Sequence, residues 1–196
     1  MPSAANAVLR DEEGRSVLRF ERVLPHPPER VWRALTEPGE LSAWHPTPFE
    51  VDRAPDGSMV RYLPEGDVPD MPDGEVSEYE PPRVLAHAWG EDHLRWELRP
   101  HDRGCLLVLA HTFDDRFKAA RDAAGWHLCL DALSSLLDGE TPGLFARRLG
   151  RTEGPEPAAL SETDATGTPQ GWQELNREYE ERFGIPPDKA TPPPRS

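Results

Sequence analysis

The chain has 196 residues, enough for one domain with an extension, and its formal net charge is −14. This acidity argues against partners such as nucleic acid or an anionic membrane surface, because both need a basic face to meet phosphate. No apolar run is long enough to span a bilayer, and the start lacks the features of a signal peptide. We therefore expect a cytoplasmic protein. Its scarcity of lysine (only Lys118 and Lys189) suggests a GC-rich bacterial genome.

The first regular element that the pattern predicts is a strand over Val17–Leu24, after a polar segment 1–15 that is loose at its start. Leu18 and Phe20 share an apolar face of this strand. Arg22 interrupts that face, and we expect its side chain to reach solvent at an edge.

Two short helices follow, over Glu29–Leu35 and Pro38–Trp44, and the proline Pro28 favours the start of the first. They are too brief to bridge parallel strands, so we expect a V-shaped support.

The rest of the sheet is predicted as strands joined by short turns, which indicates an antiparallel meander. These strands are Phe49–Asp52, Met59–Leu63, Gly74–Tyr79, Val84–Trp89, His93–Arg99 and Cys105–Phe113. The acidic, proline-rich segment 64–73 between the second and third of them is predicted to be a solvated loop.

Alternation along the last strands assigns one face to the core. The predicted inward residues are Leu85, His87, Trp89, Leu94, Trp96, Leu98, Leu107, Leu109, His111 and Phe113. On the last strand Leu106, Val108 and Ala110 are then left apolar on the outer face, and something should cover them.

A long helix over Phe117–Asp138 is predicted to pack on that inner face. Its apolar residues recur at three- and four-residue steps and include Ala123, Trp126, Leu130, Leu133 and Leu137. Gly139 follows, a residue that accepts the left-handed conformation at a helix end.

The composition changes after Gly139, so we place one domain at 1–139 and a C-terminal extension at 140–196. The extension is predicted to hold a short helix over 141–149, a flexible linker over 152–169 and a helix ending before Gly184, with 192–196 disordered. The apolar stripe of this last helix consists of Trp172, Leu175, Tyr179 and Phe183.

A helix of this length is not stable alone and must dock. We expect it on the outer face near Leu106, Val108 and Ala110, on its own chain. Two alternatives stay open: docking on a second copy, which would make a homodimer, and a lid across a cavity mouth, anchored by Trp172.

An ordered set of residues resembles one family. It comprises Pro28–Thr36, Pro38, Leu41, Trp44, Gly74-Glu75-Val76, Pro81-Pro82-Arg83, Leu85, Trp89, Trp96-Glu97-Leu98 and Gly125-Trp126. Over roughly Val17–Asp138 the chain is similar to the SRPBCC superfamily, the helix-grip fold of START lipid-transfer domains and the birch-pollen allergen. Within it, the chain resembles the bacterial group similar to the C-terminal domain of the activator of the heat-shock protein 90 ATPase. The resemblance implies an α+β helix-grip fold, with a seven-stranded antiparallel sheet around the long helix.

Chemical motifs are scarce. No nucleophile elbow, zinc-helix motif, phosphate loop or dinucleotide fingerprint occurs. Cys105 and Cys129 share no metal-ligand spacing and are predicted to be reduced core residues. His87 and His111 point inward without a third ligand at zinc-like spacing, so we predict no metal and no cofactor.

The leading hypothesis is a cytoplasmic binding protein for a small hydrophobic or aromatic ligand, held between sheet and long helix. The predicted lining residues are Trp44, His87, Trp89, Trp96, His111 and Trp126. One alternative, implied by the superfamily, is a polyketide cyclase/dehydratase-like enzyme with His87 or His111 as acid/base. The other is a protein-interaction module related to chaperone activators. A binding role without catalysis is the preferred reading.

Overall fold

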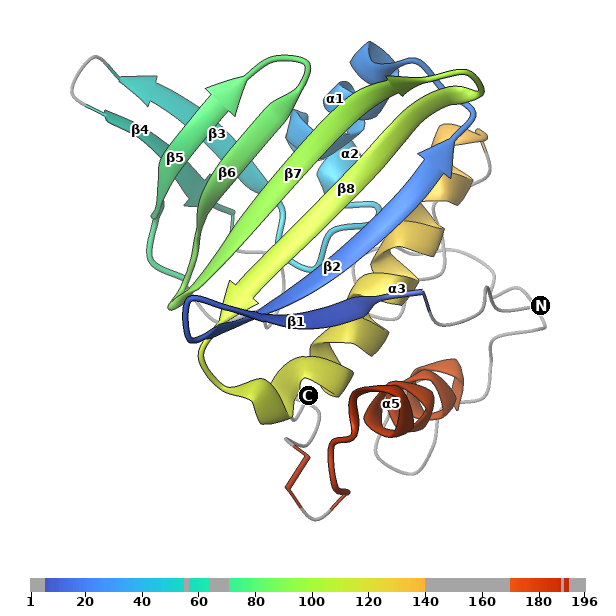
Figure 1. The fold of residues 1–196 in the computed structure, drawn as a ribbon. Helices are drawn as coiled ribbons and strands as arrows, with labels where there is room; N and C mark the ends of the chain where they lie inside the picture. The colour runs from blue at the N-terminus through green and yellow to red at the C-terminus, as the bar shows by residue number, and fades with distance from the viewer. Residues whose placement is uncertain (1–5, 55–56, 64–70, 140–169, 188, 191–196) are drawn as a thin grey trace.

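The computed structural model describes residues 6–54, 57–63, 71–139, 170–187 and 189–190. Within these ranges the chain forms one antiparallel sheet in the order β1-β2-β8-β7-β6-β5-β4-β3 (Figure 1). Its strands are β1 (Val8–Glu12), β2 (Arg15–Leu24), β3 (Phe49–Ala54), β4 (Gly57–Tyr62), β5 (Gly74–Glu80), β6 (Val84–Trp89), β7 (Asp92–His101) and β8 (Gly104–Phe113). Every strand predicted from the sequence is present.

The helices of the domain lie on one side of this sheet. They are α1 (Pro28–Thr36), α2 (Pro38–Leu41), the 3₁₀ turn η1 (Arg116–Lys118) and α3 (Ala119–Leu137). In Figure 1 α3 runs behind β8 and β2, so the sheet wraps around it as the predicted helix-grip fold requires. Gly139, directly after α3, has a φ of 76°, as predicted for a helix end. None of the described helices is both long and apolar enough to cross a membrane.

The sheet has eight strands and not seven, because residues 8–12, in the polar segment where no strand was predicted, form β1. Glu13 and Gly14 both adopt positive φ, the conformation of a tight hairpin turn that pairs β1 with β2. β1 is an edge strand, and its side chains are exposed on both faces apart from the half-buried Leu9.

The predicted inner face is confirmed at the centre of the sheet. Leu94, Trp96 and Leu98 of β7 are at most 2% exposed, and Leu107 and Leu109 of β8 are equally buried. These rows pack against α3, whose predicted stripe residues are all buried.

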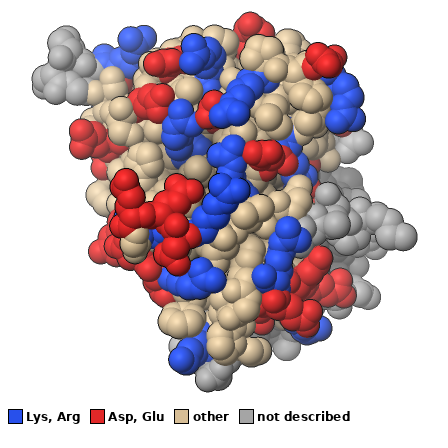
Figure 2. All heavy atoms as spheres, viewed as in Figure 1, with Lys and Arg blue, Asp and Glu red and all other residues tan. Residues whose placement is uncertain are grey.

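The outer face is not covered by the C-terminal helix, so that prediction is wrong. Val108 is only 1% exposed, yet its cross-strand neighbours are Glu21 and Glu97. Glu97 is held by Arg95 and Arg99, with N–O distances of 2.6 Å to each. The long side chains of adjacent strands therefore cover the apolar row themselves. Figure 2 shows these interleaved charges across the outer face.

The C-terminal helix α5 (Gln170–Phe183) instead packs against α3, beyond the β1 edge (Figure 1). The Tyr179 ring contacts Phe20 on the inner face of β2, with 6.4 Å between ring centroids. Its hydroxyl lies 2.9 Å from Nδ1 of His127 on α3. Leu175 and Phe183 join the same core. The helix ends at Gly184 as predicted, with a φ of 62°.

This arrangement also gives Arg22 an unexpected partner. Its side chain is only 13% exposed and does not reach solvent at an edge; Nη1 pairs with Oδ1 of Asp131 on α3 at 2.5 Å. The lid alternative gains no support, because within the described chain no ring contact joins Trp172 to the residues predicted to line the cavity. The predicted helix 141–149, the linker 152–169 and the end 192–196 lie outside the described residues.

We predict that Tyr179 anchors α5. Tyr179→Ala should lower the free energy of unfolding by about 3–5 kcal/mol, because it empties a site that is 0% exposed. Tyr179→Phe removes only the hydroxyl and should cost about 1 kcal/mol. Urea denaturation measures both changes. Glu181→Ala, on the exposed side of α5, is the matched control and should change stability by less than about 0.5 kcal/mol. Equal effects of Tyr179→Ala and Glu181→Ala would contradict docking.

Candidate functional site

The six residues predicted to line a cavity lie in one aromatic cluster between sheet and α3. They come from the segment after α2 (Trp44), from β6 (His87 and Trp89), β7 (Trp96), β8 (His111) and α3 (Trp126). Trp126 lies at the centre, with ring centroids 5.4 Å from both Trp89 and Trp96. Trp96 also meets Trp44 edge to face at 5.6 Å. The prediction that these side chains converge is therefore met, while their role as ligand contacts stays a prediction.

The cluster also contains rings that were not predicted as site residues, among them His45, Phe49 and Tyr62. The His45 ring is fully buried and lies 5.5 Å from Trp126 and 5.3 Å from Phe49. Phe49 in turn contacts His87 at 5.2 Å, so it links His87 to the tryptophans. His45 follows α2 directly in a non-repeating segment, where periodicity carries no information. Its position between Trp44 and Pro46 was the only available signal.

The α1–α2 pair brings Trp44 and His45 over the sheet. The Trp44 indole donates a 2.8 Å hydrogen bond to the carbonyl of Ala34 in α1, which fixes the ring without using another side chain. Glu40 of α2 pairs with Arg30 and Arg33 of α1 at 2.5 and 2.9 Å. The two short helices therefore act as the predicted support.

His87 is 0% exposed and is oriented from one side only. Its Nδ1 lies 3.0 Å from the Ala88 carbonyl and 3.1 Å from the Tyr62 hydroxyl, which itself donates to that carbonyl at 2.7 Å. A carbonyl can only accept, so Nδ1 carries the proton. Burial lowers the pKa of His87 from 6.5 to about 4, although the bond to the carbonyl opposes this. Its Nε2 has no hydrogen-bond partner within the described chain.

Gly74 makes this arrangement of Tyr62 and Ala88 sterically feasible. A Cβ at this position would lie 2.2 Å from the Ala88 carbonyl oxygen and 3.4 Å from the Tyr62 hydroxyl. The glycine thus permits β5 to approach the carbonyl that both Tyr62 and His87 contact.

Gly74→Ala should therefore destabilise the protein by about 1–3 kcal/mol, because the backbone must move to admit one methyl group. Gly125→Ala is the control: this glycine lies inside α3, and its Cβ would meet nothing within 4 Å. That substitution should stabilise the protein by about 0.5–1 kcal/mol. Thermal or urea unfolding compares the two, and changes of the same sign would contradict the steric account.

The buried, neutral His87 should make stability depend on pH. In the unfolded chain His87 binds its proton near pH 6.5, and in the folded chain only near pH 4. Between these values the unfolded state holds more protons, so stability is full above pH 6.5 and falls as pH is lowered towards 4. The shift corresponds to a loss of about 3 kcal/mol.

Unfolding free energies of wild type and His87→Gln, measured from pH 4 to pH 7, test this. The wild-type slope between pH 4.5 and 6 should exceed that of His87→Gln by about 1.4 kcal/mol per pH unit, one proton. His101→Gln removes an exposed histidine and should keep the wild-type slope. Parallel curves for wild type and His87→Gln would show that His87 is not buried and neutral.

His111, in contrast, is bonded through both ring nitrogens. Trp126 donates its indole N–H to Nδ1 at 3.1 Å, and Nε2 lies 2.8 Å from Oδ2 of Asp92. Because an indole can only donate, Nδ1 accepts, and the protonated Nε2 donates its N–H to the Asp92 carboxylate. Lys118 Nζ lies 2.5 Å from the same Asp92 oxygen. Burial acts to raise the pKa of the Asp92 carboxyl, but His111 and Lys118 outweigh it and hold the pKa below its usual value.

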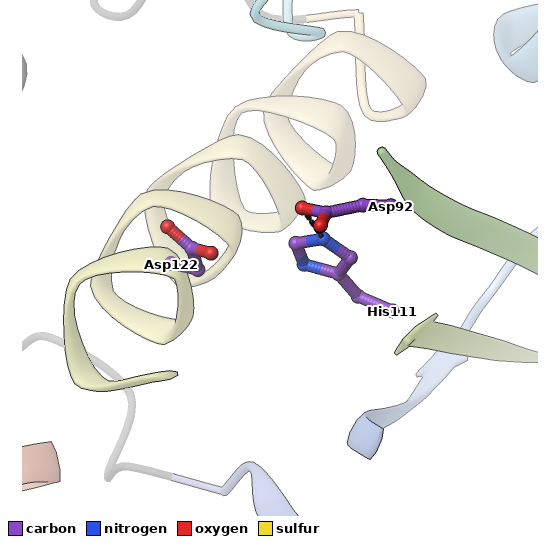
Figure 3. A group of neighbouring side chains, drawn as sticks. All are labelled: Asp92, His111 and Asp122. Atoms are coloured by element: carbon purple, nitrogen blue, oxygen red, sulfur yellow. Dashed lines mark hydrogen bonds and ion pairs between the residues drawn. The ribbon is translucent and has the colours of Figure 1, made fainter. Parts of the chain in front are cut away.

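Asp92, His111 and Asp122 form a group whose potential ligand atoms lie within 4.8 Å of one another. Figure 3 shows Asp92 against the His111 ring, with Asp122 facing them from α3. Neither aspartate was predicted from the sequence as a site residue. The Lys118 ammonium contacts Asp92 and lies 4.0 Å from Asp122, so it already supplies the positive charge. A metal ion would have to displace Lys118, and the group does not fit one as it stands.

The fold and the buried site define an SRPBCC-type helix-grip domain. The family described as "Activator of Hsp90 ATPase homolog 1-like protein" matches residues 25–138, and the chain belongs to this family. The comparison with curated proteins gave no match.

Solved structures are similar along most of the chain. A conserved protein of unknown function, EF2215, from Enterococcus faecalis has 21% identity and a TM-score of 0.63, with 91% of this chain and 90% of that one covered. CalU16 from Micromonospora echinospora has 20% identity and a TM-score of 0.59, with 93% and 97% covered. The protein encoded by gene BPP1335 from Bordetella parapertussis has 26% identity and a TM-score of 0.54, with 94% and 93% covered. The first two likenesses establish the fold alone.

Proposed function

We propose that this protein binds a small aromatic or apolar molecule between the inner face of the sheet and α3. The observation that supports the proposal is the convergence of tryptophan and histidine rings from separate strands and α3 on one buried cluster. Aromatic walls with a few polar groups are typical of small-molecule sites. Membership of an SRPBCC-type family agrees with this function class.

Access to the cluster is best at Trp89. Trp44 and Trp96 are at most 1% exposed and Trp126 is 3% exposed, whereas Trp89 near the end of β6 is only half-buried. Its ring lies tilted against both His111 and Trp126, with ring centroids 5.5 and 5.4 Å apart. A ligand that enters here separates rings already in contact, so binding should displace Trp89 first.

The described surface gives less support to a protein-interaction module. Such a module needs an exposed apolar patch. Among the described residues the exposed large hydrophobics are Val8 and Phe117. Val8 lies on the β1 edge, and the Phe117 ring is approached by Lys189 Nζ at 5.7 Å. Two separate side chains do not form a patch.

The enzymatic alternative also gains little from the geometry. An acid/base histidine needs a ring nitrogen that is free to exchange a proton with substrate. His111 has both nitrogens engaged, and the pKa of about 4 makes His87 a weak base. Binding without chemistry is the function that these two environments support best.

Titration with naphthalene and related apolar ligands should quench tryptophan fluorescence saturably in the wild type. Trp126→Phe should weaken binding, because Trp126 contacts the rings on both sides of the cluster. Trp172→Phe, on α5, is the control and should leave affinity unchanged. No saturable binding by a broad apolar panel, or equal effects of the two variants, would count against the proposal.

A further inference from the structure

Nε2 of His87 and the indole nitrogens Nε1 of Trp89 and Trp96 are buried atoms of the aromatic cluster that have no hydrogen-bond partner within the described chain. His87 is 0% exposed and Trp96 is 1% exposed, so bulk water does not serve these two side chains. A buried group left unsatisfied is costly, and such groups are rare in folded proteins.

The chemistry of each atom is fixed. An indole N–H can only donate. His87 carries its proton on Nδ1, which faces the Ala88 carbonyl, so Nε2 can only accept. These atoms thus offer one acceptor and two donors, and no hydrogen bond joins any of them to another.

We infer that these atoms form a polar subsite for a neutral aromatic ligand that carries both a hydroxyl group and a carbonyl group. The hydroxyl donates to Nε2 of His87, and the carbonyl oxygen accepts from the indoles of Trp89 and Trp96. This inference rests on the proposed function and adds the chemical class of the ligand.

Ligand neutrality follows from the surroundings. Two charged side chains, Asp92 and Lys118, reach the cluster through His111, and they are paired with each other at 2.5 Å. In the part of the chain that the structure describes, an anionic ligand would meet two N–H donors and a lysine that is already paired, and a cationic ligand would meet a carboxylate that is already paired. Burying such a charge costs far more than burying a neutral hydroxyl or ketone that is hydrogen-bonded.

A matched ligand panel on the full chain tests the inference by isothermal titration calorimetry. It comprises naphthalene, 2-naphthol, 2-acetylnaphthalene, 6-acetyl-2-naphthol and 6-hydroxy-2-naphthoate. We expect 6-acetyl-2-naphthol to bind roughly tenfold to a hundredfold tighter than naphthalene, as three added hydrogen bonds predict. The single-function ligands should fall between them, and the carboxylate should bind more weakly than the ketone.

Variants should separate the two halves of the subsite. His87→Phe should abolish the advantage of 2-naphthol over naphthalene and keep that of 2-acetylnaphthalene. Trp89→Phe and Trp96→Phe keep an aromatic ring but lose the N–H. They should reduce the advantage of 2-acetylnaphthalene over naphthalene and keep that of 2-naphthol. Tyr79→Phe, a ring outside the cluster, is the control. A variant that weakens all ligands equally would overturn the role given to that residue.

The wild-type panel decides the inference even where a variant fails to fold. If naphthalene binds as tightly as 6-acetyl-2-naphthol, the three atoms hold water or stay unsatisfied, and the subsite is wrong while the proposed function stands. If no member of the panel binds, the proposed function itself fails.

Discussion

The hydrogen bond between Trp126 of α3 and His111 of β8 is the interaction on which the site depends. It is one link in a polar chain that runs from Lys118 through Asp92 and His111 to Trp126. These residues belong to η1, to the start of β7, to β8 and to α3. The chain fixes where α3 crosses the sheet at the point where the aromatic rings meet. A purely apolar contact could slide, whereas donors and acceptors in this order define one register.

The two inward histidines consequently have different roles, although the sequence pattern treats them alike. His87 and His111 flank Leu94 in the register of β6, β7 and β8. Both ring nitrogens of His111 are hydrogen-bonded within the polar chain, so its role is structural. His87 is bonded at Nδ1 alone, and its Nε2 has no hydrogen-bond partner among the described residues. Two equally buried histidines thus differ in what they can offer a ligand, and only the contacts around each ring reveal it.

The sequence predicted the inward face of β7 because one side of this strand is charged and the other apolar, and it predicted the stripe of α3 from helical periodicity. The inward face of β6 was assigned as the side with the larger residues. Prediction failed where structure does not depend on a periodic pattern. Strand β1 is exposed on nearly all sides, so no alternation is required of it. His45 reaches the centre of the cluster from a loop. The outer row around Val108 is covered by glutamates and arginines of adjacent strands, which depends on cross-strand register and not on apolar content.

Because the strands cover the outer row around Val108 themselves, α5 packs elsewhere, against α3. The predicted stripe of α3 faces the sheet, but Ala124 and His127 outside the stripe are buried as well. A helix buried on more than one side needs a second partner. Consecutive residues show the division: Trp126 bonds to the sheet through His111, and His127 bonds to Tyr179 of α5. Asp131, one turn further on, pairs with Arg22 of β2, the residue that interrupts the apolar face of its strand. One interface therefore contains Arg22, the buried residues of α3 outside its predicted stripe, and the apolar stripe of α5. The C-terminal helix completes the core of the domain.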